Sequence, residues 1–385
     1  MGRTLPYQPA LDGVRALAIS GVVALHANIP FLLGGGLGVW VFFTLSGYLI
    51  TTLLLREAAR SGGIRRGRFY ARRALRLLPA LFVLVAVCDL WALASGPGIR
   101  QRQTLGGTLG VLFYAGNWIR ALDHHQTLGA FAHTWSLSVE EQFYIVWPLI
   151  VLVLMRLGHP RGAVVATLAG VLLSIGARAL ATYVSGYGPR VREGTDSIAD
   201  QLLVGCALAL FLHHWPSGPA HDRFATALRW AVWPASILLA AIVLWPEQIG
   251  LYSPQFILIG LPSLVSLCSV VLIGFLVTSP GSLGARMLGV APLAWLGRIS
   301  YSLYLWHVPV FVVLGGAHLR PLGRITLGIA LSLALAAASY YLVELPVLRL
   351  RKRAVPAPRL GVALREREPD AGAVHVVPDR GALRG

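Results

Sequence analysis

The chain has 385 residues, of which 56% are hydrophobic and only 13% are charged, and its mean hydropathy is +0.67. This composition is too apolar for a soluble globular protein of that length. Apolar stretches of about 20 residues, long enough to cross a hydrocarbon core about 30 Å thick, recur along almost the whole chain. We therefore predict an all-α, polytopic integral membrane protein rather than two or three soluble domains.

The formal net charge is +17, and all but one of the 33 basic residues are Arg. A nucleic-acid-binding protein can carry such a charge, but here the Arg residues fall between apolar runs, which favours a role in membrane topology. The three Cys all lie inside apolar segments, so we expect no disulfide and no thiolate metal site. We also find no spaced set of His and carboxylate residues that predicts a metal, and we expect no nucleic-acid partner.

Eleven apolar segments follow one another along the chain. The first is expected to be a retained helix rather than a signal peptide, because Asp12 flanks its core and no clear A-x-A cleavage site follows. The segments lie near residues 11–30, 37–55, 76–95, 105–119, 138–155, 162–184, 196–212, 230–246, 255–277, 295–316 and 322–345.

The charge of the connecting loops indicates which segments cross the membrane. Residues 56–76 hold eight Arg and are expected to be cytoplasmic. If residues 105–119 do not cross, most later Arg-bearing loops and the C-terminal tail fall on the same side. If they do cross, that asymmetry is largely lost. We predict ten crossings of the cell membrane with both termini cytoplasmic, and residues 105–119 interfacial or re-entrant.

The chain is expected to form one membrane domain followed by a tail. Residues 1–348 contain all the apolar segments and form the predicted transmembrane domain. Residues 349–385 are rich in Arg, Pro, Gly and acidic residues and have no apolar periodicity. We expect this tail to be cytoplasmic and disordered.

Ionisable residues inside a membrane helix normally face a partner or a cavity. Arg15 and His26 are eleven residues apart in the first segment, which places them on one helix face with Cα atoms about 16 Å apart along the axis. Asp12 can pair with Arg15, and His26 is suited to act as a general base or as a nucleophile. The alternatives are that Arg15 reaches lipid headgroups and that His26 only bonds a carbonyl. Arg178 and Asp200 also lie within or beside crossings, with no evident partner.

Three Arg residues, Arg72, Arg73 and Arg76, lie at the start of the third predicted crossing. Arg72 and Arg76 share a helix face, and so do Arg73 and Arg76. Arg binds phosphate bidentately and does not lose its charge, and a helix start favours anions. The pattern is typical of a cytoplasmic phosphate site, or alternatively of positive-inside topology with contacts to anionic lipid.

Two adjacent carboxylates, Glu140 and Glu141, stand in the stretch "HTWSLSVEEQFYIVWPLIVL". We expect them to open the fourth crossing on its outer side, where they would complement the helix dipole with Ser136 or Ser138 as the cap. Capping explains one carboxylate and not two. We therefore expect one of them to hold an Arg or to orient His26.

Aromatic and imidazole side chains gather in the same block and in "GRISYSLYLWHVPV". We assign His133, Trp135, Tyr301 and His307 to substrate binding; the alternative for the aromatic residues is an interfacial belt. Glu344 ends the last crossing, and we expect it to pair with a nearby cytoplasmic Arg.

Six blocks occur in one order: "LDGVRALA" with Arg-x10-His, "GVWVFFTLSGYLI", "RFYARRALRLLPA", "HTWSLSVEEQFYIVWP", "LGRISYSLYLWHVPV" and "YYLVELP". Together they closely resemble the membrane-bound acyltransferase-3 family over roughly residues 8–348. No single block is specific, but the ordered set is.

The resemblance implies ten crossings around a polar cavity. It also implies transfer of an acyl group, usually acetyl, from cytoplasmic acyl-CoA to a sugar hydroxyl. By resemblance, His26 and Arg15 match the essential first-helix pair, and Arg73 and Arg76 match the cytoplasmic Arg-x-x-Arg, with Arg72 adjoining. Many members add a C-terminal extracytoplasmic hydrolase-like domain. We expect a stand-alone form here, so the acceptor stays open between a surface glycan and a macrolide-type natural product.

The candidate residues and the family resemblance together lead to one hypothesis for the mechanism of acyl transfer. The three Arg hold the phosphates of acyl-CoA, which is a co-substrate rather than a bound cofactor, and His26 deprotonates the acceptor hydroxyl that attacks the thioester. A transient acyl-His26 is the alternative, and Glu140 or Glu141 is expected to orient the imidazole. The expected partners are acyl-CoA, a carbohydrate or glycosylated acceptor, and membrane lipid. The rival functions are a transporter of a sugar or lipid-linked glycan, disfavoured by the lack of an inverted repeat, and a lipid-binding scaffold.

Overall fold

The regular structure of the protein is helical throughout the part that the computed structural model describes, residues 7–122, 128–186, 188–245 and 260–354. This confirms the predicted all-α fold. The first half of the chain forms α1 (Pro9–His26), η1 (Pro30–Leu37), α2 (Gly38–Ser61), α3 (Arg66–Ala94), α4 (Ile99–Leu112), α5 (Gly116–Leu122), η2 (Gly129–Thr134), α6 (Trp135–Arg156) and α7 (Pro160–Ser185). The second half forms α8 (Pro189–Glu193), α9 (Thr195–His214), α10 (Pro219–Leu244), α12 (Leu261–Thr278), α13 (Leu283–Leu288), α14 (Ala291–Arg298), α15 (Ser300–Leu314), α16 (Pro321–Ser339), the π-helical η3 (Tyr340–Glu344) and α17 (Leu345–Ala354).

Eight helices in the described ranges are long and apolar enough to cross a membrane, as expected of a multi-pass membrane protein. Helix α15 is apolar but shorter, and α1 has 18 residues that include Asp12 and Arg15. The count of ten crossings stays a prediction. Residues 105–119 fall on α4 and α5, two short helices separated by a break, and neither is among the eight. This arrangement favours the prediction that they do not cross.

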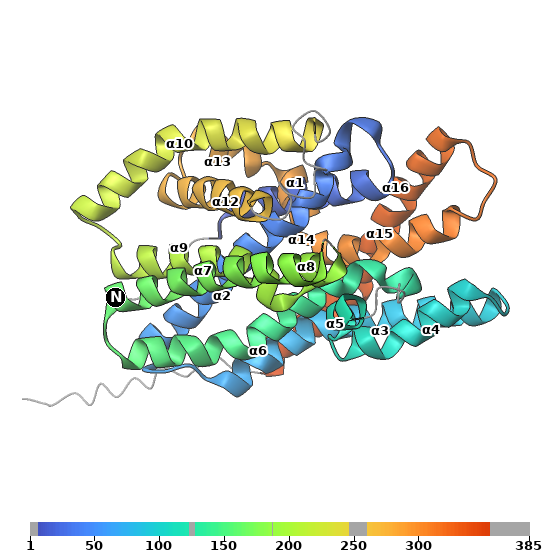
Figure 1. Ribbon diagram of the computed structural model, residues 1–385, viewed down its shortest axis with the longest axis horizontal. Helices are drawn as coiled ribbons and strands as arrows, with labels where there is room; N and C mark the ends of the chain where they lie inside the picture. Colours follow the sequence, from blue (N-terminus) through green and yellow to red (C-terminus); the bar gives the residue numbers. More distant parts are fainter. Residues whose placement is uncertain (1–6, 123–127, 187, 246–259, 355–385) are drawn as a thin grey trace, which may run out of the picture.

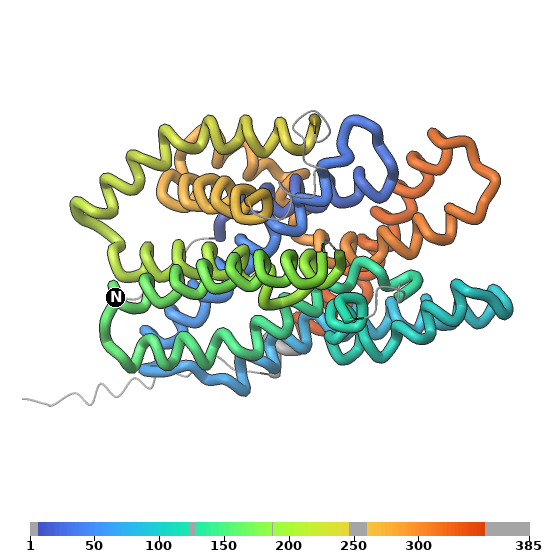
Figure 2. The backbone as a smooth tube through the Cα atoms, viewed as in Figure 1, coloured from blue at the N-terminus to red at the C-terminus, as the bar shows by residue number. Residues whose placement is uncertain are grey.

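Helix α9 packs along both α2 and α7, and α12 lies against α9, α2 and α10 (Figure 1). Helix α1 packs against α2, α14 and α15. The α3–α4 and α15–α16 turns lie at one end of the molecule, and the α6–α7 and α9–α10 turns lie at the other (Figure 2). These ends agree with the two groups of loops that the charge pattern separates.

The helices α2 and α9 touch backbone to backbone through two glycines. A Cβ atom at Gly47 would lie 1.9 Å from the carbonyl oxygen of Leu202, and one at Gly205 would lie 2.0 Å from that of Thr44. Small residues permit such close crossings in membranes, where dispersion contacts replace the hydrophobic effect between helices. The crossing fixes α2, which carries residues of the candidate site.

Replacing Gly205 by Ala is expected to destabilise the fold by about 1–3 kcal/mol, because the added methyl overlaps a carbonyl that cannot move without shifting α2. The measurement is the apparent Tm of the detergent-purified protein. Gly176→Ala is the matched control, since Gly176 is also inside a helix and has open space around it. Its Tm should be unchanged or higher, because Ala favours a helix over Gly. An equal Tm for both variants would contradict the tight crossing.

The C-terminal part differs from prediction in two respects. Helix α17 continues to Ala354, beyond the expected domain boundary at 348, and the rest of the predicted tail lies outside the described residues. The expected ion pair of Glu344 is not formed among the described residues, although Arg76 and Arg15 attract this carboxylate electrostatically. The buried carboxylate ends the π-helical turn, faces α15, and accepts a hydrogen bond from the hydroxyl of Ser302.

Candidate active site

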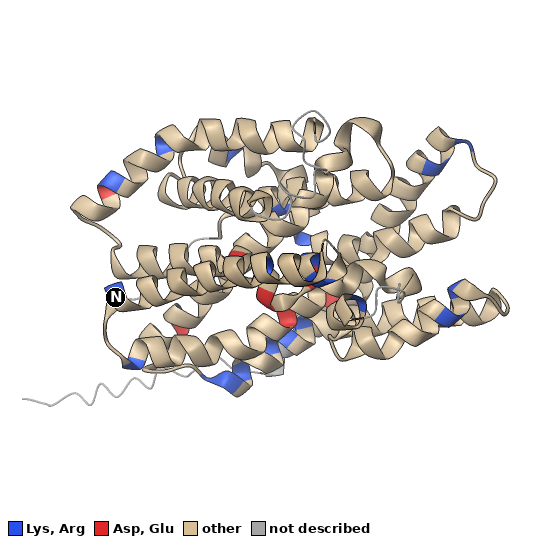
Figure 3. Ribbon diagram, viewed as in Figure 1, with Lys and Arg blue, Asp and Glu red and all other residues tan. Residues whose placement is uncertain are grey.

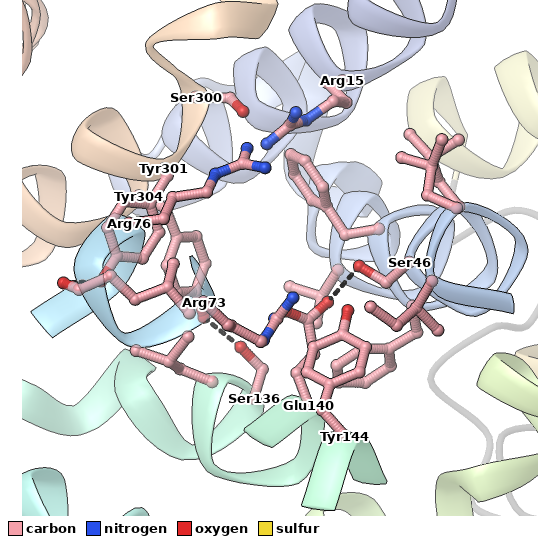
Figure 4. A pocket seen from close by; sticks show the side chains of 18 of the residues that line it. Arg15, Ser46, Arg73, Arg76, Ser136, Glu140, Tyr144, Ser300, Tyr301 and Tyr304 are labelled. Atoms are coloured by element: carbon pink, nitrogen blue, oxygen red, sulfur yellow. Dashed lines mark hydrogen bonds between the residues drawn. The ribbon is translucent and has the colours of Figure 1, made fainter. Parts of the chain in front are cut away.

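Charged residues are sparse along the helices, and several acidic and basic ones come together near the middle of the molecule (Figure 3). There, a first cavity of about 320 Å³ opens between α1, α2, α3, α6 and α15 (Figure 4). Its polar lining residues are Arg15, Ser46, Arg73, Arg76, Ser136, Glu140, Tyr144, Ser300, Tyr301 and Tyr304.

Two guanidinium groups point toward each other across the first cavity, those of Arg15 and Arg76 (Figure 4). Arg15 keeps a partner at the predicted spacing, because its Nη1 lies 3.8 Å from Oδ1 of Asp12. Arg76 is exposed to the cavity and has no ion pair among the described residues. The buried hydroxyl of Ser300 beside them has no hydrogen-bond partner in that same part of the chain. Two facing cations and a free hydroxyl favour an anion between them.

The other two Arg of the predicted cluster already have carboxylate partners. Arg73 donates from Nε to both oxygens of Glu141 at 2.8 and 3.1 Å, its Nη2 lies 2.7 Å from Oε1, and it stacks 3.4 Å over the ring of Tyr144. Arg72 pairs with Glu57 at 2.5 Å and does not line the first cavity. The three Arg are therefore not one equivalent set, and Arg76 is the member that faces open space.

The structure corrects the expected roles of the two adjacent carboxylates. Helix α6 begins at Trp135, directly after η2, so Glu140 and Glu141 lie beyond its first turn and do not open it. No side chain caps this helix. Glu140 accepts a hydrogen bond from Ser46 at 2.7 Å, and Glu141 holds Arg73 as one alternative expected. Among the described contacts, neither reaches His26, so the predicted orienting role is wrong.

A second cavity, of about 680 Å³, lies beside the C-terminal end of α1. His26 is exposed to it, and His133 and Trp135 also contribute to its wall. Its charged lining was not singled out from the sequence as part of a site. The charged residues of this lining are Arg120, Arg178, Arg192 and Glu193. Arg120 and Glu193 form an ion pair at 2.9 Å.

The two cavities are stacked along the helices that line both. Along α1, Arg15 faces the first cavity and His26 the second, about 16 Å further along the axis. Along α15, Tyr301 faces the first and Val308 the second. The predicted polar interior is thus divided into two chambers at successive depths, and α1 presents one candidate residue to each.

Val39 and Tyr304 line both cavities and form the wall between them. The hydroxyl of Tyr304 lies 2.6 Å from that of Ser136 and donates to the carbonyl oxygen of His133 at 2.5 Å. Both bonds hold the phenol ring in one position. The sequence did not indicate this role for Tyr304, because its partners are more than 160 residues away.

Three imidazoles lie together at the second cavity. The ring of His307 lies 4.9 Å from that of His26 and 5.2 Å from that of His133. Nδ1 of His26 lies 2.9 Å from the carbonyl oxygen of Val22, so this nitrogen carries the proton and Nε2 has a free lone pair. His26 therefore bonds a backbone carbonyl and also faces the cavity. The sequence analysis treated the carbonyl bond as an alternative to a catalytic role.

The four residues assigned to substrate binding have different positions. Tyr301 lines the first cavity and donates to the carbonyl oxygen of Leu77 at 2.9 Å, whereas Trp135 and His133 line the second. His307 is completely buried behind His26 and lines neither. Among the described residues, no group of three or more His, Cys, Asp or Glu is placed to hold a metal ion.

Arg178 and Asp200, which had no evident partner in the sequence, form a buried bidentate ion pair between α7 and α9. The nitrogen–oxygen distances are 2.9 and 3.2 Å, and the hydroxyl of Ser263 bonds both side chains at 2.6 Å. The pair stands behind the second cavity, which Arg178 reaches.

Comparison with protein families matches residues 8–343 to the acyltransferase domain. The chain is 33% identical over 349 residues to the O-acetyltransferase OatA of Staphylococcus aureus (strain NCTC 8325 / PS 47), covering 89% of this chain and 57% of that protein. It is 33% identical over 362 residues to the putative peptidoglycan O-acetyltransferase YrhL of Bacillus subtilis (strain 168), with 89% and 55% covered. It is 32% identical over 359 residues to the peptidoglycan O-acetyltransferase OatA of Listeria monocytogenes serovar 1/2a, with 89% and 56% covered. The chain thus spans little more than half the length of these relatives. No solved structure matches.

Proposed function

The chain belongs to the acyltransferase domain family, and from that premise we propose that it moves an acyl group, acetyl above all, from acyl-CoA to a hydroxyl of a carbohydrate acceptor. The observation that carries the proposal is the pair of stacked cavities. One presents two facing guanidinium groups, of which that of Arg76 has no ion pair among the described residues. The other presents an imidazole with a free lone pair, and Val39 and Tyr304 lie where the two cavities meet. Such an arrangement suits a group-transfer enzyme with one substrate on each side of a membrane.

We assign the acyl-CoA donor to the first cavity. Arg15, Arg76 and the hydroxyl of Ser300 offer donors to a phosphate group of CoA. Residues 56–76, with eight Arg, span the end of α2 and the start of α3 beside this cavity and would be cytoplasmic by the positive-inside rule. The donor would then enter from the cytoplasm, and both chain ends would lie on that side of the cell membrane.

We assign the carbohydrate acceptor to the second cavity. Its volume of about 680 Å³ is within the range of small-molecule sites, and its lining combines tryptophan rings with charged groups. The names of two relatives specify peptidoglycan, which supports a cell-wall glycan over a glycosylated natural product as the acceptor.

In the proposed reaction, Nε2 of His26 takes the proton of the acceptor hydroxyl while the hydroxyl oxygen bonds to the thioester carbon. The C–S bond breaks, and His26 returns the proton to the CoA sulfur. The route through acyl-His26 uses the same nitrogen as nucleophile. Both routes need the Nδ1–H tautomer that the carbonyl of Val22 imposes.

The function is tested with purified protein in liposomes, given acetyl-CoA and soluble peptidoglycan fragments. Release of CoA and a fragment heavier by one acetyl group are the expected results. A transporter would instead move the glycan without consuming acetyl-CoA. If neither CoA nor acetylated product forms with peptidoglycan fragments, and a panel of other glycans also fails, the proposed reaction is wrong.

Arg76→Gln is expected to raise the KM for acetyl-CoA about 10- to 100-fold, because one or two charge-assisted hydrogen bonds to phosphate are lost. Initial rates at varied acetyl-CoA concentration measure it. Arg72→Gln is the matched control: Arg72 is one turn away on α3 but pairs with Glu57 outside the cavity. Its KM should change less than about twofold. Equal effects of the two substitutions would instead support a general electrostatic role of the whole cluster.

A further inference from the structure

The boundary between the two cavities is formed by residues that line both. Its shared members are Val39 on α2 and Tyr304 on α15. Tyr304 is held by its hydrogen bonds to Ser136 and to the carbonyl of His133. Neither the ring nor its hydroxyl can swing aside without breaking both bonds, so this side of the wall is the rigid one.

The position of Val39 is fixed by its neighbour. A Cβ atom at Gly38 would lie 2.1 Å from the carbonyl oxygen of Ala18 and 3.0 Å from a methyl of Val22, so α2 is in direct backbone contact with α1 at this level. Because the backbone is pinned there, the space between α2 and Tyr304 depends on the side chain at position 39. The two methyl groups of Val39 narrow the space between α2 and the ring of Tyr304.

Only the thioester end of the donor has to enter the gap between Val39 and Tyr304. On the proposed function, the CoA phosphates stay beside Arg15 and Arg76, and the reacting imidazole of His26 is about 16 Å away along α1. The thioester end of the donor must therefore reach between Val39 and Tyr304, and its acyl chain enters this gap together with the reacting carbon. An acetyl group has one carbon beyond the carbonyl, whereas each further methylene adds volume that a close-packed wall resists.

We propose that Val39, against the fixed ring of Tyr304, is the residue that selects short acyl chains. This inference rests on the proposed function and adds the class of donor, a short-chain acyl-CoA. The selection is steric, and it acts on the acyl chain alone, so it leaves the affinity for the CoA moiety unchanged.

The test compares rates of transfer from acetyl-, butyryl- and hexanoyl-CoA by the wild-type protein, Val39→Ala and Val39→Ile. For Val39→Ala, the ratio of hexanoyl to acetyl transfer should rise at least tenfold over the wild-type ratio. For Val39→Ile, acetyl transfer should fall and longer chains should not react, with the KM for acetyl-CoA unchanged.

Val41→Ala is the matched control. Val41 has the same side chain, lies two residues further along α2, is likewise partly buried, and packs beside hydrophobic clusters that include α12 rather than lining either cavity. Its chain-length ratio should equal that of the wild type. The inference is overturned if Val39→Ala keeps acetyl transfer with the wild-type ratio, or if Val41→Ala shifts the ratio equally. Absence of transfer by the wild-type protein would instead refute the proposed function.

Discussion

Replacing His26 by Ala is expected to lower acetyl transfer at least ~10³-fold while leaving the fold intact. A positioned general base accounts for about 10²–10⁴ in rate, and a covalent route through the same nitrogen would lose more. His26 is exposed to the second cavity, so truncation removes little packing. The measurement is the initial rate of CoA release in liposomes, with the apparent Tm and the gel-filtration profile recorded on the same sample.

The control for His26 is His213→Ala, at the exposed end of α9 and outside both cavities. It should keep full activity. Rapid quenching with acetyl-CoA alone then separates the two routes. An acetyl group trapped on wild-type protein and absent from the His26 variant indicates the acyl-enzyme, and its absence from both indicates general-base catalysis. Wild-type activity in the His26 variant would remove the mechanism altogether.

The parts of the site that were predictable depend on local geometry. The spacing of Arg15 and His26 is a property of one helix, so helical periodicity alone placed them on one stripe, and the structure brings each to a different cavity. The i, i+3 pair of Asp12 and Arg15 is equally local. The ordered sequence blocks also indicated the family. They contain residues from α1, α2, α3, α6 and α15, which come together around the first cavity.

The parts that were missed depend on contacts between distant segments. The sequence suggested that Glu141 could hold an Arg, but choosing Arg73 rather than Arg76 needed the packing of α6 on α3 across 68 residues. The start of α6 was misplaced because η2 runs straight into it without a capping side chain, which leaves no local signal. Glu344 was expected to pair with a nearby cytoplasmic Arg, whereas the π-helical turn places it within hydrogen-bonding distance of Ser302 on α15.

The second large effect is expected from Asp200→Asn, which should destabilise the fold by about 3–5 kcal/mol. The side chains of Arg178 and Asp200 are 2% and 0% exposed, so the substitution leaves a guanidinium charge buried without a counter-charge. Ser263 cannot compensate, because a hydroxyl carries no charge. The apparent Tm of the detergent-purified protein measures the effect, and retention of the wild-type Tm would show that the pair is not needed for stability.

The double variant Arg178→Met with Asp200→Leu decides what the pair is for. Removing both charges together abolishes the unpaired ion, and apolar side chains of similar size often restore or exceed the original stability. Its Tm should therefore lie above that of Asp200→Asn. If the double variant is stable but has a raised KM for the acceptor, Arg178 acts on the substrate in the second cavity that it lines. If stability is restored and the KM for the acceptor equals that of the wild type, the ion pair has no part in recognition, and apolar packing between α7 and α9 can replace it. A double variant less stable than the single one would contradict the argument, because the cost would then come from lost hydrogen bonds to Ser263 and the Ser197 carbonyl rather than from an uncompensated charge.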